Sequence, residues 1–103
     1  MEKILVVEDN EVQILWAEKT LSDYTTTVVR SVEEAQVVME KGSFDIILCD
    51  LELPFSSQSH NVSWYNGYCF FEGNIIPLLE TGKIKGASLI SNFEQPLSLF
   101  QRR

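Results

Sequence analysis

The sequence predicts a single α/β domain with a parallel sheet over residues 1–103. Short runs of apolar and β-branched residues alternate with segments of helical periodicity, as in domains built from β-α-β units. The chain has 103 residues, of which 45% are hydrophobic, and this size suits one core. Three of the apolar runs are nearly continuous, which is typical of strands covered by helices on both faces of a sheet.

The first part of the chain predicts two strands and the helix between them. Residues 3–7 (KILVV) are apolar and predict the first strand. Asp9 or Asn10 can cap a helix over residues 11–22. Residues 25–29 (TTTVV) are rich in β-branched side chains and predict the second strand.

The next part predicts a second helix and a third strand. Ser31 and Glu34 have the S-x-x-E spacing of a capping box, which opens a helix over residues 32–41. Gly42 is a natural end for that helix. The run FDIILC at residues 44–49 predicts the third strand.

The second half of the chain is less regular. Residues 50–67 are polar and predict a connection that is long for a compact domain. We expect a helix over residues 67–80 with a kink or break at Pro77, because its ring would meet the carbonyl of Gly73. Residues 87–91 (ASLIS) predict the fourth strand.

Composition argues against some classes of partner. The chain has 15 acidic and 8 basic residues, with a net charge of −7, so no basic surface is expected for nucleic acid. It contains no apolar run long enough for a membrane span. Met1 is not followed by a basic segment and an apolar leader, so a cytoplasmic location is expected.

Acidic residues follow two of the predicted strands. Glu8 and Asp9 end the first strand, and Asp50 ends the third. If these strands are neighbours, their carboxyl ends bring three carboxylates to one edge of the sheet, where a divalent cation such as Mg²⁺ would offset the repulsion. An ionised Asp beside a phosphoryl group and Mg²⁺ can act as a nucleophile. Alternatively, these acids are loop residues, with Asp9 as a helix cap.

Two motifs, ILVVEDN and DIILCDLELP, carry a resemblance to a known family. Together they resemble the receiver domain of the response regulators of bacterial two-component systems, and the resemblance covers residues 3–91. It implies a flavodoxin-like, doubly wound parallel sheet with strand order 2-1-3-4-5, of which this chain is expected to keep the order 2-1-3-4. It also implies a signalling protein that takes a phosphoryl group from a histidine kinase or phosphotransfer protein, with no enzymatic activity beyond self-phosphorylation and autodephosphorylation.

The resemblance also implies roles for individual residues. Asp50 matches the phosphoacceptor, and Asp9 matches the acid that binds Mg²⁺ directly. Glu8 matches the acid that acts on the metal through water. The main-chain carbonyl of Glu52 would be a further metal ligand. Ser91 matches the residue that contacts the phosphoryl group and switches position.

Two further matches and one insertion lie beside the expected site. Pro54 and Gly67 match the proline and the glycine that follow the phosphoacceptor in the family. Residues 55–66 make the intervening segment longer than in the family. This segment is either a lid or docking loop, carrying Trp64 and Tyr65, or a surface insertion without a role.

The sequence departs from the family after the fourth strand. The twelve residues after Ser91 contain no Lys, whereas a receiver has an essential Lys near the end of its fifth strand. We expect a truncated domain that lacks the fifth strand and the fifth helix. The fourth strand would then be an exposed edge, which favours a homodimer or strand exchange.

These departures leave a second function open. A degenerate receiver would bind a protein partner without using phosphorylation. The absent Lys favours this alternative, and the intact acids disfavour it.

Helix 11–22 has two apolar strips, and only one of them can face the sheet fully. One strip consists of Ile14, Ala17 and Leu21, and the other of Val12, Leu15 and Trp16. The strip that does not face the sheet is either a docking contact or isolated apolar surface.

Overall fold

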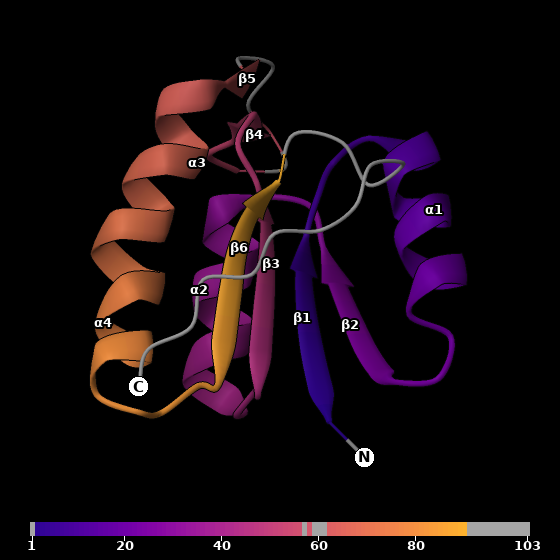
Figure 1. The fold of residues 1–103 in the computed structure, drawn as a ribbon. Helices are drawn as coiled ribbons and strands as arrows, with labels where there is room; N and C mark the ends of the chain where they lie inside the picture. Colours follow the sequence, from indigo (N-terminus) through magenta and orange to yellow (C-terminus); the bar gives the residue numbers. More distant parts are fainter. Residues whose placement is uncertain (1, 57, 59–61, 91–103) are drawn as a thin grey trace.

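Four parallel strands form the main sheet of the computed structural model, which describes residues 2–56, 58 and 62–90 (Figure 1). The strands lie in the order β2-β1-β3-β6. Their bounds are β1 Lys3–Val7, β2 Thr25–Val29, β3 Ile46–Asp50 and β6 Gly86–Ile90. The predicted α/β class with a parallel sheet is confirmed. The last predicted residue of the fourth strand, Ser91, lies outside the described residues.

Helices cover both faces of this sheet (Figure 1). Helix α1 (Glu11–Thr20) packs on one face. On the other face lie α2 (Val32–Lys41) and a continuous helical segment. This segment consists of α3 (Trp64–Phe70), the π-helical turn η1 (Phe71–Ile75) and α4 (Ile76–Glu80).

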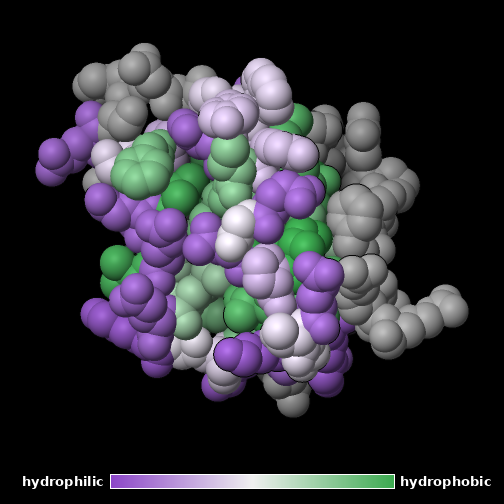
Figure 2. All heavy atoms as spheres, turned by 90° about the vertical axis from the view of Figure 1, so that its left-hand side faces the viewer, coloured by the Kyte–Doolittle hydropathy of each residue, from purple (hydrophilic) through white to green (hydrophobic). Residues whose placement is uncertain are grey.

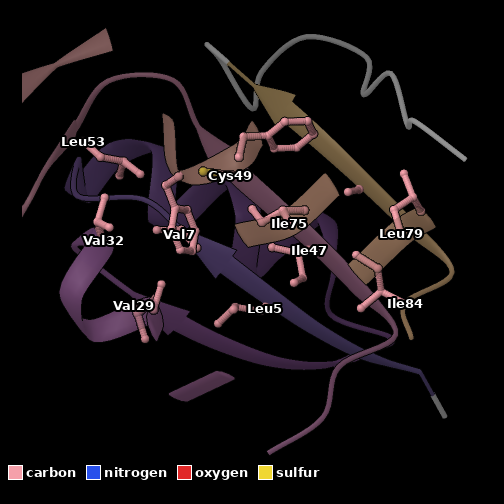
Figure 3. Packing of buried hydrophobic residues seen from close by; sticks show 14 residues of the cluster. Leu5, Val7, Val29, Val32, Ile47, Cys49, Leu53, Ile75, Leu79 and Ile84 are labelled. Carbon is pink, nitrogen blue, oxygen red and sulfur yellow. The ribbon is translucent and has the colours of Figure 1, made fainter. Parts of the chain in front are cut away.

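Alternation along the strands divides the apolar residues into two clusters. In β1, Leu5 and Val7 point towards α2, whereas Ile4 and Val6 point towards α1. Figure 3 shows the larger cluster, in which residues of β1 and β3 meet α2 and the helical segment that contains η1. The buried residues of the smaller cluster are Ile4, Val6, Ala17, Leu21, Leu48 and Ile90. Burial on both faces explains why the strands read as continuous apolar runs.

Only one of the two apolar strips of α1 is buried. Ile14, Ala17 and Leu21 are buried. By contrast, the side chains of Val12, Leu15 and Trp16 are 55%, 64% and 39% exposed. Within the described residues, no helix combines the length and the apolar character that crossing a membrane requires.

Side chains cap the first two helices as the sequence predicts, with one difference. Of the two candidates for α1, Asn10 is the cap, and its Oδ1 accepts hydrogen bonds from the second and third helical N–H groups at 3.0 and 3.1 Å. Ser31 Oγ accepts a hydrogen bond from the Glu34 N–H at 3.2 Å. The Glu34 carboxylate accepts the return bond from the N–H of Arg30, at 3.3 Å, so this bond reaches one residue further back than in a standard capping box.

Three predicted boundaries need correction. The third strand begins at Ile46, not at residue 44, and it includes Asp50, because Asp50 still pairs with Ile90 in the sheet. The fourth strand begins one residue early, at Gly86. Helix α1 ends at Thr20, where a turn replaces its predicted last residues.

The prediction that the third helix begins at Gly67 is wrong. The helix begins at Trp64, because Ser63 Oγ accepts a hydrogen bond from the Tyr65 N–H at 3.1 Å and caps it. Within the preceding connection, β4 (Leu53–Pro54) and β5 (Val62–Ser63) form a short antiparallel pair, so the segment is not only loop.

The predicted interruption before Pro77 takes the form of the π-helical turn η1. Pro77 has no N–H to donate to the carbonyl of Gly73, and its ring would crowd that carbonyl. The N–H of Ile76 instead donates to the carbonyl of Phe71, five residues back. The helical segment therefore continues through the proline to Glu80.

The outer surface of α3, η1 and α4 is mixed in character. Figure 2 shows polar side chains (purple) on this side of the molecule, with apolar groups (green) between them. Trp64, Tyr65 and Tyr68 are exposed, and their rings meet edge to face. The insertion thus ends in an exposed aromatic group.

Candidate functional site

The register of the sheet places two acids side by side. Val7 of β1 pairs with Cys49 of β3, so Glu8 and Asp50 are adjacent at the carboxyl ends of their strands. Val7 and Cys49 face α2, and alternation turns Glu8 and Asp50 to the side of α1. Both acids are buried, with only 2% of Glu8 and 7% of Asp50 exposed. The main chain of Glu8 is fixed by its N–H, which donates to the carbonyl of Val29 at 2.9 Å.

The three acids predicted from sequence lie together. One carboxylate oxygen each from Glu8, Asp9 and Asp50 lies within 4.8 Å of the others, and this group could hold a metal ion. Carboxylate oxygens are the ligands that hard divalent cations bind in proteins. The predicted convergence of the acids at one edge of the sheet is therefore confirmed.

Burial changes the acidity of the two inner carboxyl groups. Burial and a hydrogen bond with Glu8 raise the pKa of Asp50 to about 8. Burial also raises the pKa of Glu8, although its hydrogen bonds oppose this change. A hydrogen bond between two carboxyl groups needs a proton, so the metal-free pair holds one at neutral pH. A cation bound at the cluster would displace that proton.

Asp9 occupies a different position from the inner pair. Its side chain is half-buried, and burial raises its pKa while the nearby positive charge of Arg30 opposes the rise. Asp9 is thus the most exposed of the three acids in the cluster. This position suits the role of direct metal ligand.

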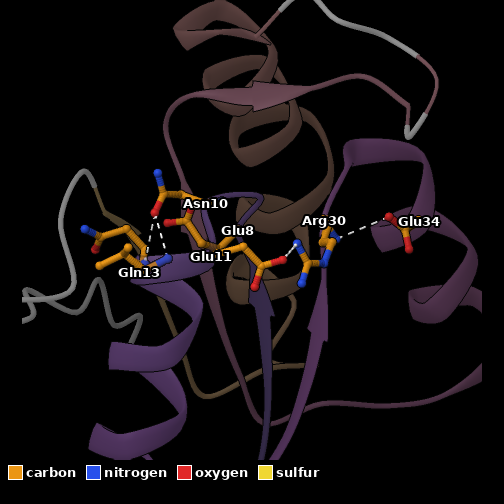
Figure 4. A network of polar contacts seen from close by, with 7 residues as sticks. Glu8, Asn10, Glu11, Gln13, Arg30 and Glu34 are labelled. Carbon is orange, nitrogen blue, oxygen red and sulfur yellow. Dashed lines mark hydrogen bonds and ion pairs between the residues drawn. The ribbon is translucent and has the colours of Figure 1, made fainter.

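The start of α1 orients the Glu8 carboxylate. Its Oε2 accepts a hydrogen bond from the N–H of Asn10 at 3.1 Å, while the side chain of Asn10 caps the helix (Figure 4). Asn10 therefore orients the Glu8 carboxylate with its main-chain N–H and caps α1 with its side chain. The positive end of the helix also favours negative charge at this edge.

A cavity of about 530 Å³ lies over the acids, large enough for a cation, its waters and a phosphoryl group. Its walls come from the end of β1, the start of α1 and the segment after β3. The lining residues are Glu8, Asp9, Asn10, Glu11, Gln13, Asp50, Leu51 and Glu52. Glu52 thus borders the cavity, and the role of its main-chain carbonyl at a metal stays a prediction.

Gly67 lets α3 approach the backbone that carries Asp50. A Cβ atom at this position would lie 2.1 Å from the carbonyl oxygen of Leu51 and 2.5 Å from that of Asp50. Neither contact is possible without moving main-chain atoms, so only glycine fits here. Gly67 thereby allows α3 to pack directly against the main chain of Asp50 and Leu51.

Arg30 is a residue at this edge of the sheet that the sequence patterns did not indicate. Arg30 Nη1 lies 2.7 Å from Oε1 of Glu11, which is one of the residues that line the cavity (Figure 4). The sequence did contain one indication of this, because Arg30 directly follows the second strand and so reaches the same edge of the sheet.

Ser91, the predicted phosphoryl contact, lies outside the described residues. Pro54 is buried in β4.

Comparisons of the chain with protein-family models, curated proteins and solved structures find no match.

Proposed function

We propose that this chain is a receiver-type phosphoacceptor domain with a flavodoxin-like fold, which takes a phosphoryl group onto Asp50. The observation that carries this proposal is the convergence of Glu8, Asp9 and Asp50 beneath one cavity at the carboxyl edge of a parallel sheet. Ligands of open α/β sheets bind at this edge. The two motifs that resemble receiver domains supply all three acids.

The proposed site assigns a separate task to each acid. Asp9 and the main-chain carbonyl of Glu52 would hold Mg²⁺ directly, and Glu8 would hold it through water. Bound Mg²⁺ supplies positive charge that favours the ionised form of Asp50 and offsets the charge of the phosphoryl oxygens.

Asp50 then acts as the nucleophile. One of its carboxylate oxygens forms a bond to phosphorus, while the bond between phosphorus and the donor breaks and the donor keeps the electron pair. With a phosphohistidine donor, the leaving nitrogen remains on the imidazole ring of the kinase or phosphotransfer protein. The product is an aspartyl phosphate, whose phosphoryl group would lie in the cavity above Asp50.

Acetyl phosphate labelling tests this function directly. With Mg²⁺ present, intact mass spectrometry should show the addition of one phosphoryl group to the wild type and none to Asp50→Asn. Asp45→Asn is the matched control, because Asp45 lies just before β3 at the opposite end of the same strand. If the wild type stays unlabelled with acetyl phosphate, phosphoramidate and a set of histidine kinases, the proposal fails.

A second candidate is a degenerate receiver that binds a protein without phosphorylation. The exposed side chains of Val12, Leu15 and Trp16 on α1 favour it, because they leave an apolar strip in contact with solvent. Lys19 lies over the Trp16 ring, with Nζ 5.5 Å from its centroid. Partner binding that survives Asp50→Ala but is lost in Leu15→Asp would favour this candidate over the first.

The outer strand β6 supports a homodimer as the proposed assembly. Among the described residues, no strand pairs with the outer edge of β6, and such an edge can add a strand from a second copy. Light scattering at micromolar concentration should then show a dimer. A stable monomer would contradict this assembly without affecting the proposed chemistry.

A further inference from the structure

The basic residues of the described chain are unevenly distributed about the sheet. Lys3 begins β1, and Lys83 and Lys85 precede β6, so all three lie at the amino ends of the strands. Lys19 and Lys41 lie in the last turns of α1 and α2, which run back towards the same end. Within residues 2–56, 58 and 62–90, Arg30 is the one basic residue at the carboxyl edge, where it directly follows β2.

Arg30 is held at this edge by a contact that can be exchanged. Its Nη1 lies 2.7 Å from Glu11 Oε1, and the two side chains are 48% and 72% exposed. Ion pairs with this degree of exposure stabilise proteins only weakly. Glu11 itself lines the cavity above the acid cluster, so its ion pair places the Arg30 guanidinium beside a residue of the cavity wall (Figure 4).

A phosphoryl group in this cavity would need more positive charge than one divalent cation supplies. Glu8, Asp9 and Asp50 line the cavity together with Glu11 and Glu52, and the phosphoryl oxygens would add further negative charge. Sites that transfer phosphoryl groups place cations against the oxygens that carry the developing charge. A guanidinium is well suited to this task, because it donates two parallel N–H bonds to phosphoryl oxygens.

We propose that Arg30 is the phosphoryl-binding cation of this site, and that it exchanges the Glu11 carboxylate for the oxygens of the incoming phosphoryl group. This inference rests on the proposed function, because it needs a phosphoryl group on Asp50. Glu11 is then a positioning residue, which keeps Arg30 at the rim when no phosphoryl group is present.

The exchange makes two opposite predictions about one variant. Removing the charge of Arg30 takes a cation away from the acid cluster, so Arg30→Gln should bind Mg²⁺ as tightly as the wild type or more tightly. The same variant should bind beryllofluoride, a mimic of the phosphoryl group, about tenfold more weakly in saturating Mg²⁺, which is the usual effect of losing a charge-assisted hydrogen bond. A residue with only a structural role would not separate these two affinities.

Three matched variants complete the experiment. Lys19→Gln removes the same charge at the far end of α1 and should leave beryllofluoride affinity unchanged. Arg30→Lys keeps the charge without the paired N–H groups and should fall between Arg30→Gln and the wild type. Glu11→Gln releases Arg30 and should strengthen beryllofluoride binding. Thermal melting of each variant without ligand verifies that the fold is retained.

The binding results distinguish a failure of the role of Arg30 from a failure of the proposed phosphoacceptor function. If the wild type binds beryllofluoride and Arg30→Gln binds it equally well, the role of Arg30 is overturned and the proposed function stands. If Arg30→Gln loses affinity for Mg²⁺ and beryllofluoride to the same extent, the role of Arg30 is also overturned, because the residue then acts on the whole site. If the wild type binds no beryllofluoride with Mg²⁺, both proposals fail.

Discussion

The acidic side chains at the two ends of the parallel sheet differ in burial and in their partners. At the amino end, the acids are partly exposed and have partners: the Asp45 carboxylate accepts a hydrogen bond from the main-chain N–H of Lys3 at 2.9 Å, and Lys85 Nζ lies 3.6 Å from the Glu2 carboxylate. At the carboxyl end, Glu8 and Asp50 are buried against each other.

This difference predicts which end of the sheet should respond to a bound cation. Partly exposed acids that have a hydrogen-bond donor or a basic side chain as partner cost the fold little. Two buried carboxyl groups destabilise the folded chain as soon as both ionise, because burial and mutual repulsion disfavour the charged forms. A bound cation removes that cost, so the carboxyl end is the part of the molecule whose stability should depend on metal.

The largest expected effect comes from filling the space beside the Asp50 backbone. Gly67→Ala should lower the free energy of unfolding by about 3 kcal/mol, because its Cβ would overlap the carbonyl oxygens of Asp50 and Leu51. Urea denaturation measures this loss. In Gly73→Ala, the new Cβ meets no atom within 4 Å, so the free energy should stay the same or rise. Equal losses in the two variants would show that Gly67 makes no such close contact.

Removing one charge from the buried pair should stabilise the metal-free protein. At pH 8 in a chelator, Asp50→Asn should raise the free energy of unfolding by at least about 1 kcal/mol, because each unit by which burial raises the pKa of Asp50 makes its ionisation cost about 1.4 kcal/mol. Asp45→Asn, at the other end of the strand, should give no increase. Chemical denaturation of both variants provides the measurement. A drop in Asp50→Asn would mean that the ionised carboxylate has a stabilising partner.

The stability of the metal-free protein should also fall as pH rises from about 5 to about 8. The pKa of Asp50 is raised to about 8 and that of Glu8 is raised as well, so the folded state binds more protons than the unfolded state in this window. Stability therefore decreases as those protons leave, by at most about 1.4 kcal/mol per pH unit for each group. Thermal melting in a chelator across this range measures the slope, and saturating Mg²⁺ should reduce it. A stability that rises with pH would contradict the buried, protonated pair.

The smallest expected change in stability comes from Asn10, which caps α1 and hydrogen-bonds to Glu8. Asn10→Ala should cost about 1 kcal/mol, because two helical N–H groups lose their acceptor. Asn10→Ser should restore most of that stability, since Ser is also a good cap. Thermal melting compares the two, and equal losses would show that the cap is not the cause.

The sequence was enough to predict the four strands of the main sheet and the meeting of the acids. Both follow from patterns within the chain: continuous apolar runs imply buried parallel strands, and acids that directly follow two neighbouring strands must share an edge. The break before Pro77 was also predictable, because a missing N–H acts locally.

Other features depend on contacts that no local pattern reveals. The true start of α3 depends on which of several serines in a polar segment becomes the cap, and Ser63 is chosen by the pairing of β5 with β4. The ion pair of Arg30 with Glu11 joins residues from different elements, so it follows from the placement of α1 against β2. The reason for glycine at position 67 is likewise a tertiary contact, with the backbone after β3.

Thermal melting with and without Mg²⁺ tests the central claim most directly, namely that the acids at the carboxyl edge form a cation site. The melting temperature of the wild type should rise with millimolar Mg²⁺, because an ion that binds only the folded state stabilises it. It should rise further with beryllofluoride. Asp9→Asn should lose both increases, whereas Asp45→Asn should keep them. An unchanged melting temperature in the wild type, or an equal rise in Asp9→Asn, would contradict the account.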